Sequence, residues 1–183
     1  DLLMNLCKAS PDRELELLKV ICFCLPVAME AREAAEEFFT VFSTLIATDG
    51  RKYYLSTGGY LTLLCDNLNS EVKRIEEAEL VTTSTTDLTQ GFTLQKLVQI
   101  ISSLLQIPEI ITTFKERESH IASILSAFLS LRTIIVQKTS LTTDSCEMLR
   151  ELTDKLQVTD KDKQLFITAC MDALTTRTDN YTA

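Results

Sequence analysis

The sequence is poor in the residues that make tight turns: it has four glycines and three prolines among 183 residues. All-β folds need turn residues at short intervals, so this composition excludes that class. Tryptophan is absent and histidine occurs once, as His120. No apolar run reaches the roughly 18 residues that a membrane span requires. The sequence therefore predicts an all-α fold without a membrane span.

The chain also lacks the marks of a leader sequence. It begins Asp-Leu-Leu without a methionine and shows no basic, hydrophobic and small-residue zones in order. We therefore expect no signal peptide and expect this chain to be a piece of a longer protein.

Positive charge is the scarcer sign, with 18 basic against 26 acidic side chains and a net charge of −8. Nucleic-acid binding depends on clustered Lys and Arg, so we expect no nucleic-acid partner. The cysteines are scattered, and most fall on apolar helix faces, where a free thiol behaves as a small hydrophobe. We infer a reducing, intracellular setting: the cytoplasm, with the nucleus as a second location. The cysteines are Cys7, Cys22, Cys24, Cys65, Cys146 and Cys170.

Groupings of residues that carry catalysis or hold metals are missing as well. Cys22 and Cys24 are the only close cysteine pair, His120 lies far from both, and zinc needs such ligands together. There is no Gly-rich phosphate loop and no nucleophile elbow. We interpret His120 as a helix-start or interface residue rather than a general base. The sequence thus predicts no catalytic residue, no cofactor site and no metal ligand in this segment.

What the chain does have is a distinctive stretch at 49–68 that holds three of its four glycines. We interpret it as a short helix, a structural corner and a new Leu-rich helix, with Gly50, Gly58 and Gly59 supplying the backbone freedom for the corner. Leu61, Leu64 and further apolar residues at helical spacing give the new helix one face to bury. This order is typical of one unit of an armadillo or HEAT-like α-solenoid.

The rest of the chain predicts more helices around this corner. A short helix opening at Pro108, a charged corner and a long apolar-striped helix echo the first corner about sixty positions later, and such repetition is the sequence sign of a solenoid. We therefore expect one helical-repeat segment over 1–176, with a loop at about 82–91 and a polar tail at 177–183. The other expected helices cover 2–8, Pro11 to a stop or kink at Pro26, about 28–47, a helix resuming at Leu94, a helix capped by Asp144 and a helix starting at Thr159.

The densest aromatic and basic cluster lies at the start of the corner stretch. It can be a hot spot for a protein partner, since such surfaces are enriched in tyrosine and arginine. Alternatively, the short helix buries one tyrosine between neighbouring repeats and leaves the charges in water. The sequence leaves both possibilities open. The residues are Arg51, Lys52, Tyr53, Tyr54 and Tyr60.

Five ordered strings carry a resemblance to a known family. They are Gly-Gly-Tyr-Leu-Thr-Leu-Leu-Cys-Asp at 58–66, Glu-Val-Lys-Arg at 71–74, Asp-Leu-Thr-Gln-Gly at 87–91, Leu-x-Leu-Arg-x-Ile-Ile-Val-Gln-Lys-Thr at 129–139 and Met-Leu-Arg-Glu-Leu at 148–152. In that order they resemble the C-terminal half of the giant UBR-box E3 ubiquitin ligases, the family called Pushover, Calossin or BIG. The similarity covers most of 50–170, and 1–48 are placed by continuity.

The resemblance implies a non-catalytic scaffold segment of a ligase of the N-degron and protein quality-control pathway. It would position the recognition and transfer modules, contact neighbouring repeats and offer a protein-binding surface. The resemblance also implies an E2 enzyme and calmodulin as partners of the parent protein. It implies zinc as a cofactor only in other modules of that protein. No UBR-box or zinc-module motif matches here, so no functional residue carries over.

Two rival readings remain. One is a stand-alone helical adaptor unrelated to ubiquitin, which an open reading frame confined to these residues would favour. The other is an enzyme that uses a buried cysteine. Cys65 and Cys170 lie in apolar stripes, where burial raises the thiol pKa and suppresses reactivity.

Overall fold

The computed structural model describes residues 11–81, 90–134, 140–164 and 167–168. Within these ranges the chain is helical and has no strand, which confirms the predicted all-α class. The labelled helices are α2 (Pro11–Glu30), α3 (Arg32–Leu45), α4 (Asp49–Thr57), α5 (Tyr60–Val81), α6 (Gln90–Leu104), α7 (Pro108–Lys115), α8 (Glu118–Ile134) and α9 (Ser140–Lys155).

Local signals predicted several helix starts correctly. Pro11 begins α2 and Pro108 begins α7, because proline is tolerated in the first turn, where its missing N–H has no helical partner. Thr159 caps the turn after α9: its hydroxyl accepts from the Asp162 N–H at 3.2 Å, and the Asp162 carboxylate accepts from the Thr159 N–H at 2.8 Å.

The sequence predicts a stop or a kink at Pro26, and the stop does not occur. Pro26 lies inside α2, and Leu25 and Met29 beside it are buried on the same side of the helix as Leu18. The chain breaks at Ala31 instead, so the helix expected over about 28–47 is α3, from Arg32 to Leu45.

The helix expected to be capped by Asp144 also starts elsewhere. It is α9, which begins at Ser140, so Asp144 lies within the helix and does not cap it. The expectations for 2–8 and 177–183 and most of the expected loop at 82–91 fall outside the described residues; α6 begins at Gln90.

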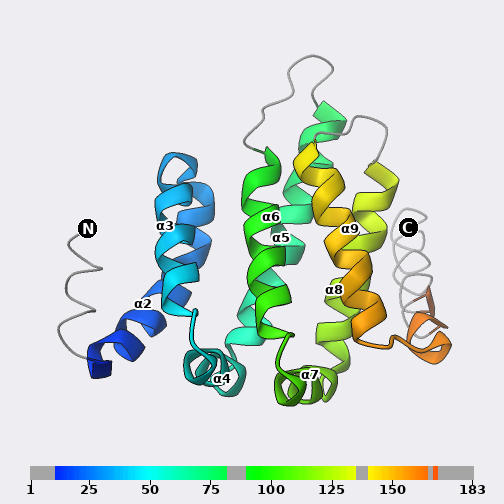
Figure 1. Cartoon of the computed structure of the whole chain (residues 1–183). Helices are drawn as coiled ribbons and strands as arrows, with labels where there is room; N and C mark the ends of the chain where they lie inside the picture. The colour runs from blue at the N-terminus through cyan, green and yellow to red at the C-terminus, as the bar shows by residue number, and fades with distance from the viewer. Residues whose placement is uncertain (1–10, 82–89, 135–139, 165–166, 169–183) are drawn as a thin grey trace, which may run out of the picture.

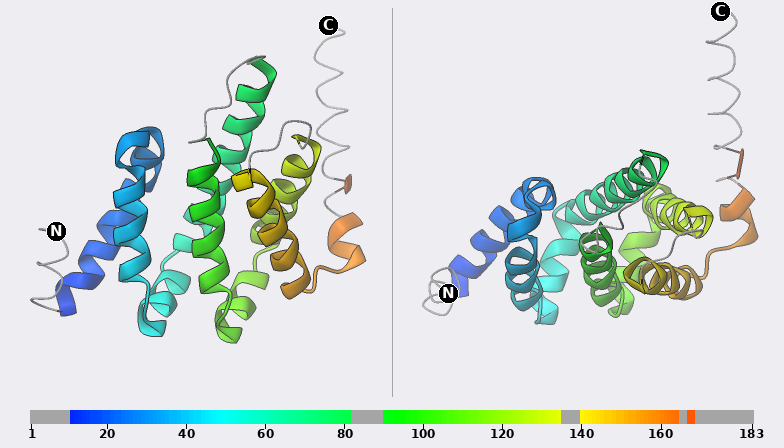
Figure 2. Two further views of the ribbon diagram at one scale, coloured as in Figure 1. Left: turned by 45° about the horizontal axis from the view of Figure 1, so that its top comes forward. Right: turned by 90° about the horizontal axis from the view of Figure 1, so that it is seen from above.

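The helices follow a regular pairing. Each of the helices α2 to α6 packs on the helix that comes third after it: α2 on α5, α3 on α6, α4 on α7, α5 on α8 and α6 on α9. Figure 1 shows the long helices side by side, with the short helices α4 and α7 together at one end. Seen from above in Figure 2, the pairs of long helices follow one another along the molecule.

One connected core runs through the stack. Apolar faces of α2 to α9 meet in it, and the largest fully buried side chains include Phe39, Phe42 and Phe114. Removing apolar surface from water at roughly 25 cal/mol per Å² is the main force that holds such helices together. Of the described helices, none alone is long and apolar enough to cross a membrane; α6 and α7 reach that length and hydropathy only as a pair bent by 110°.

Polar side chains also join α5 to α8 inside this stack. Thr62 Oγ1 lies 2.9 Å from His120 Nε2, and Asn69 Nδ2 donates to Ser123 Oγ at 3.0 Å. Hydrogen bonds between half-buried groups are directional, so they determine which residues face each other more strictly than apolar contacts do. These bonds therefore set the register between two helices that lie far apart in sequence.

Candidate functional site

The predicted corner lies between α4 and α5. α4 ends at Thr57, Gly58 follows with φ −91°, and Gly59 has φ 78°, which is left-handed backbone that favours glycine. Hydroxyls of Ser56 and Thr57 donate to carbonyl oxygens of the last turn of α4, at 2.7 and 3.0 Å. Gly50 is not part of this corner: it lies in the first turn of α4, without a positive φ.

The two basic residues of the predicted cluster point into the protein. Arg51 is half-buried, and its Nη1 donates to the Leu45 carbonyl oxygen at 3.0 Å, at the end of α3. Lys52 is buried, and its Nζ lies 3.7 Å from the Asp49 carboxylate. Arg51 therefore joins α4 to the end of α3, Lys52 pairs within the first turn of α4, and neither cation lies free in water.

Tyr54 and Tyr60 come together across the corner. Their ring centroids are 5.8 Å apart, and Phe23 of α2 meets the Tyr60 ring edge-on at 6.4 Å. Lys19 Nζ lies 5.9 Å from the Tyr54 ring centroid and 2.7 Å from the Glu16 carboxylate. A cation over an aromatic face is attracted by the ring quadrupole, so α2, α4 and α5 meet in an aromatic cluster that already holds a cation.

Contacts within this cluster shift the pKa values of two of its groups. The Glu16 carboxylate, and then the Tyr54 hydroxyl, raise the pKa of Lys19. Burial, followed by the hydrogen bond with Tyr54, raises the pKa of Tyr60. Near neutral pH the cluster therefore contains a charged Lys19 ammonium group and a neutral Tyr60.

Tyr53 points away from this cluster. It is exposed, and its hydroxyl hydrogen-bonds the Glu109 carboxylate in the first turn of α7, which raises the pKa of Tyr53. Tyr53 and Tyr54 are adjacent in a helix, where successive side chains point about 100° apart. The predicted five-residue cluster is thus divided among three places, and its role as a partner surface stays a prediction.

His120 is an interface residue, as the sequence predicts. It is buried where α5, α7 and α8 meet, and its ring lies 4.9 Å from that of Phe114. Arg117 Nη1 donates to Thr62 Oγ1 at 3.1 Å, which leaves the Thr62 proton free to point at His120 Nε2. Burial lowers the pKa of His120, the Phe114 backbone opposes that shift, and Arg117 adds to it.

Two of the described cysteines lack the setting of an activated nucleophile. Cys22 and Cys65 are buried, and burial raises the thiol pKa of each to about 12. Thiols in such places are protonated and unreactive near neutral pH. Cys24 is exposed and Cys146 half-buried. Among the described residues, no group of three or more His, Cys, Asp or Glu side chains is placed to hold a metal ion.

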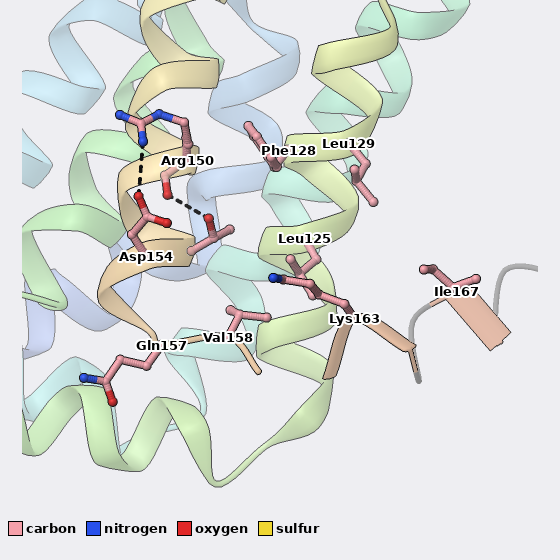
Figure 3. A pocket seen from close by; sticks show the side chains of 10 residues that line it. Leu125, Phe128, Leu129, Arg150, Asp154, Gln157, Val158, Lys163 and Ile167 are labelled. Carbon is pink, nitrogen blue, oxygen red and sulfur yellow. Dashed lines mark hydrogen bonds and ion pairs between the residues drawn. The ribbon is translucent and has the colours of Figure 1, made fainter. Parts of the chain in front are cut away.

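One cavity lies beside α8 and α9 and has a volume of about 510 Å³. Figure 3 shows Leu125, Phe128 and Leu129 of α8 facing it, with Ile167 across from them. On the α9 side, Arg150 is paired with Asp154 at 3.2 Å. The cavity is thus an apolar groove with a charged rim, a common form of protein-binding surface.

A second cavity, of about 440 Å³, lies between α2 and α5. Its polar wall contains Glu71, which is buried and accepts from Arg74 Nε at 2.9 Å. Met29 and Pro26 of α2 form the opposite side.

Sequence reasoning missed both cavities and the parts that Lys19 and Phe23 play in the aromatic cluster. The available signal was Phe23 itself, an aromatic residue on a helix that is apolar on several sides.

The fold and these features define an all-α segment with an apolar groove beside α8 and α9 and an aromatic cluster where α2, α4 and α5 meet. Comparison with known proteins finds no matching family model and no matching solved structure. It does find very long relatives. The chain is 35% identical over 174 residues, 94% of its length, to the auxin transport protein BIG of Oryza sativa subsp. japonica.

Two further relatives match nearly the whole chain. A probable E3 ubiquitin-protein ligase of Dictyostelium discoideum is 38% identical over 171 residues, which are 92% of this chain. Protein purity of essence of Drosophila pseudoobscura pseudoobscura is 24% identical over 164 residues, 89% of this chain. The chain is therefore homologous to a segment of the giant proteins of the BIG/Pushover family, as its ordered strings indicate, and spans about 3% of the length of each of these relatives.

Proposed function

We propose that this chain is a scaffold segment of a giant E3 ubiquitin-protein ligase, built as an armadillo or HEAT-like α-solenoid. The pairing of each helix with the third one after it carries the proposal. Such a pairing arises when three-helix units stack with the same geometry, so that corresponding helices become neighbours. The long α3, short α4 and long α5 correspond to α6, α7 and α8 in this order.

The relatives support the link to ubiquitin. One of them is named a probable E3 ubiquitin-protein ligase, and it matches 92% of this chain. In the proposed role the stack holds distant recognition and transfer modules of one polypeptide at a fixed separation, in the N-degron and quality-control pathway and in the cytoplasm. E2 enzymes and calmodulin would contact other parts of that polypeptide, and zinc would be held there as well.

The scaffold role predicts that the segment acts on substrates through geometry. The test uses the full-length protein, with residues 32–134 replaced by a flexible Gly/Ser linker of equal residue number. We expect ubiquitin discharge from the charged E2 enzyme to be kept, because the transfer module is untouched. Ubiquitination of a bound substrate should fall sharply, because the linker no longer fixes the distance between modules.

Two outcomes would contradict the proposal. Loss of E2 discharge would show that the segment takes part in transfer itself, and unchanged substrate ubiquitination would show that its geometry is irrelevant. Gly50→Ala is the matched control, because a Cβ at Gly50 meets open space and the variant should match wild type in both ubiquitin assays. A natural reading frame confined to these residues would favour the stand-alone adaptor.

A further inference from the structure

Helix α2 is apolar on two opposite sides. Its inner side, with Leu18 and Leu25 fully buried, packs on α3 and α5. Its other side exposes Val20, Phe23 and Val27 by 55%, 73% and 67%, with Cys24 exposed between them. We call these four residues the outer stripe of α2. The sequence predicts a helix covered on most sides, but the described residues leave this side open.

The outer stripe begins where the contact with α5 ends. Phe23 touches Tyr60 of α5 at the edge of that contact, and Pro26 and Met29 line the cavity between the two helices. Val20 and Val27 share one side of α2, because residues seven apart return to nearly the same side of a helix. That side lies further round the helix than Phe23, and both valines are exposed there. The spacing of the stripe is the one with which a helix packs on another helix.

The pairing of the helices indicates what belongs on this side. α5 has two partners of its own kind, α2 on one side and α8 on the other. α2 has α5 on one side, and its opposite side is the outer stripe. In the same pattern, the missing partner is the helix third before α2, which would lie about fifty to sixty positions earlier in the polypeptide.

The size of the stripe argues for a partner in the same polypeptide. A free-standing complex buries about 800 Å² on each side with roughly 20–30 residues, because it must offset the loss of translational and rotational freedom. Four side chains on one helix cannot reach that area. A neighbouring unit of the same chain avoids this cost, since the connection keeps its effective concentration high. Relatives in which this segment is only 3% of the length offer ample chain for such a unit.

We propose that the outer stripe of α2 is the joint to the preceding helical unit of the same polypeptide, whose helix packs on Val20, Cys24 and Val27 with its own apolar face. The proposal rests on the proposed solenoid.

Cys24 reports on the joint, because it lies inside the stripe and is a free thiol. The experiment measures alkylation of individual cysteines by mass spectrometry in the native full-length protein. We expect Cys24 to react as slowly as buried Cys65, at least about tenfold slower than in the double variant Val20→Asp/Val27→Asp, which breaks the joint. Cys65 should stay slow in both proteins, which shows that the core around α5 stays closed. Fast labelling of Cys24 in the native protein would overturn the proposal.

Two further measurements separate the possible failures. A short bismaleimide, which alkylates two thiols, should join Asn69→Cys and Ser123→Cys, whose native side chains are hydrogen-bonded between α5 and α8. If the cross-link forms and Cys24 is alkylated quickly, the proposed joint is wrong but the packing of α5 on α8 is kept. If the cross-link does not form, α5 and α8 are not neighbours and the solenoid itself is wrong. In sedimentation, the 183-residue chain should not dimerise through the stripe. A concentration-dependent dimer that Val20→Asp abolishes would assign the stripe to a second copy and overturn the proposal.

Discussion

The turns from α4 to α5 and from α7 to α8 join a short helix to a long one with different chemistry. The first turn uses Gly59 at φ 78°. The second has no glycine and no positive φ; the backbone N–H of His120 donates to the Arg117 carbonyl oxygen at 3.0 Å, and the bend is made by ordinary residues. The stack thus requires the change in direction and not the glycine.

The short helices also differ in how they are held. α7 buries Ile110 and Phe114 completely, and the Phe114 ring lies against His120 beyond the turn. α4 buries Leu55 completely, together with the stem of Lys52. The turn after α4 is made by the backbone conformation of Gly59 and needs less packing beside it. The turn after α7 depends instead on the buried side chains of α7. Four predictions test this difference.

The largest expected effect is at Phe114. Phe114→Ala should lower the free energy of unfolding by about 3–5 kcal/mol, because it leaves a cavity at the point where α7, α8 and His120 meet. Leu55→Ala in α4 should cost about 2–5 kcal/mol and less than Phe114→Ala, since fewer buried atoms are lost. Urea denaturation measures both, with exposed Lys115→Ala as control. An equal or larger loss at Leu55 would contradict the comparison.

The next effect concerns the glycine turn. Gly59→Val should destabilise the chain by about 1–2 kcal/mol or more, because a branched side chain is strained at φ 78°. Gly50→Ala is its matched control: it lies in a helix with open space for a Cβ and should stabilise by about 0.5–1 kcal/mol. Thermal unfolding distinguishes the two substitutions. An unchanged Tm for Gly59→Val would mean that this turn, like that after α7, tolerates ordinary residues.

The third effect is pH-dependent and belongs to the turn after α7. Burial holds the folded-state pKa of His120 below its ordinary value of 6.5, so the unfolded chain binds the proton more readily. Stability should therefore be full above 6.5 and decline as the pH falls through that value towards the folded pKa. Urea midpoints measured on both sides of 6.5 should fall in the wild type and stay level in His120→Gln over this interval.

A matched variant sharpens this test. Asp66 is the nearby charge that favours protonated His120, whereas Arg117 disfavours it. Asp66→Asn should lower the pKa of His120 further and steepen the decline in stability. A decline that persists in His120→Gln would assign it to other groups.

The fold follows from the sequence where the signals are local. Pro108 at a helix start and Gly59 at a turn each act through their own backbone, so the short helices and corners were predictable. Of the stop or kink expected at Pro26, the stop does not occur, because packing on both sides of the proline outweighs one lost helix bond.

The candidate site was less predictable, because it depends on which helices become neighbours. Tyr53 and Tyr54 are adjacent in sequence, yet one faces α7 and the other faces α2 and α5. Thr62 and His120 meet from helices more than fifty positions apart, and no local pattern pairs them.

The smallest effect is at the contact between the two short helices. The Tyr53 hydroxyl donates to the Glu109 carboxylate, which favours the neutral phenol and raises the pKa of Tyr53 above its ordinary 10.0. Glu109→Gln should return that pKa towards 10.0, as measured by NMR titration of labelled tyrosine, and leave the urea midpoint unchanged, because both groups are exposed.

Asp49→Asn is the control for general charge effects, since Asp49 acts on Tyr53 only at longer range and contributes less. If Glu109→Gln leaves the titration of Tyr53 unchanged, α4 and α7 do not meet as described, and the correspondence between the two turns loses its direct contact. If the pKa falls as expected, α4 and α7 lie side by side although one is followed by a glycine turn and the other is not. That result would place the regularity of the stack in the pairing of its helices rather than in a repeated turn sequence.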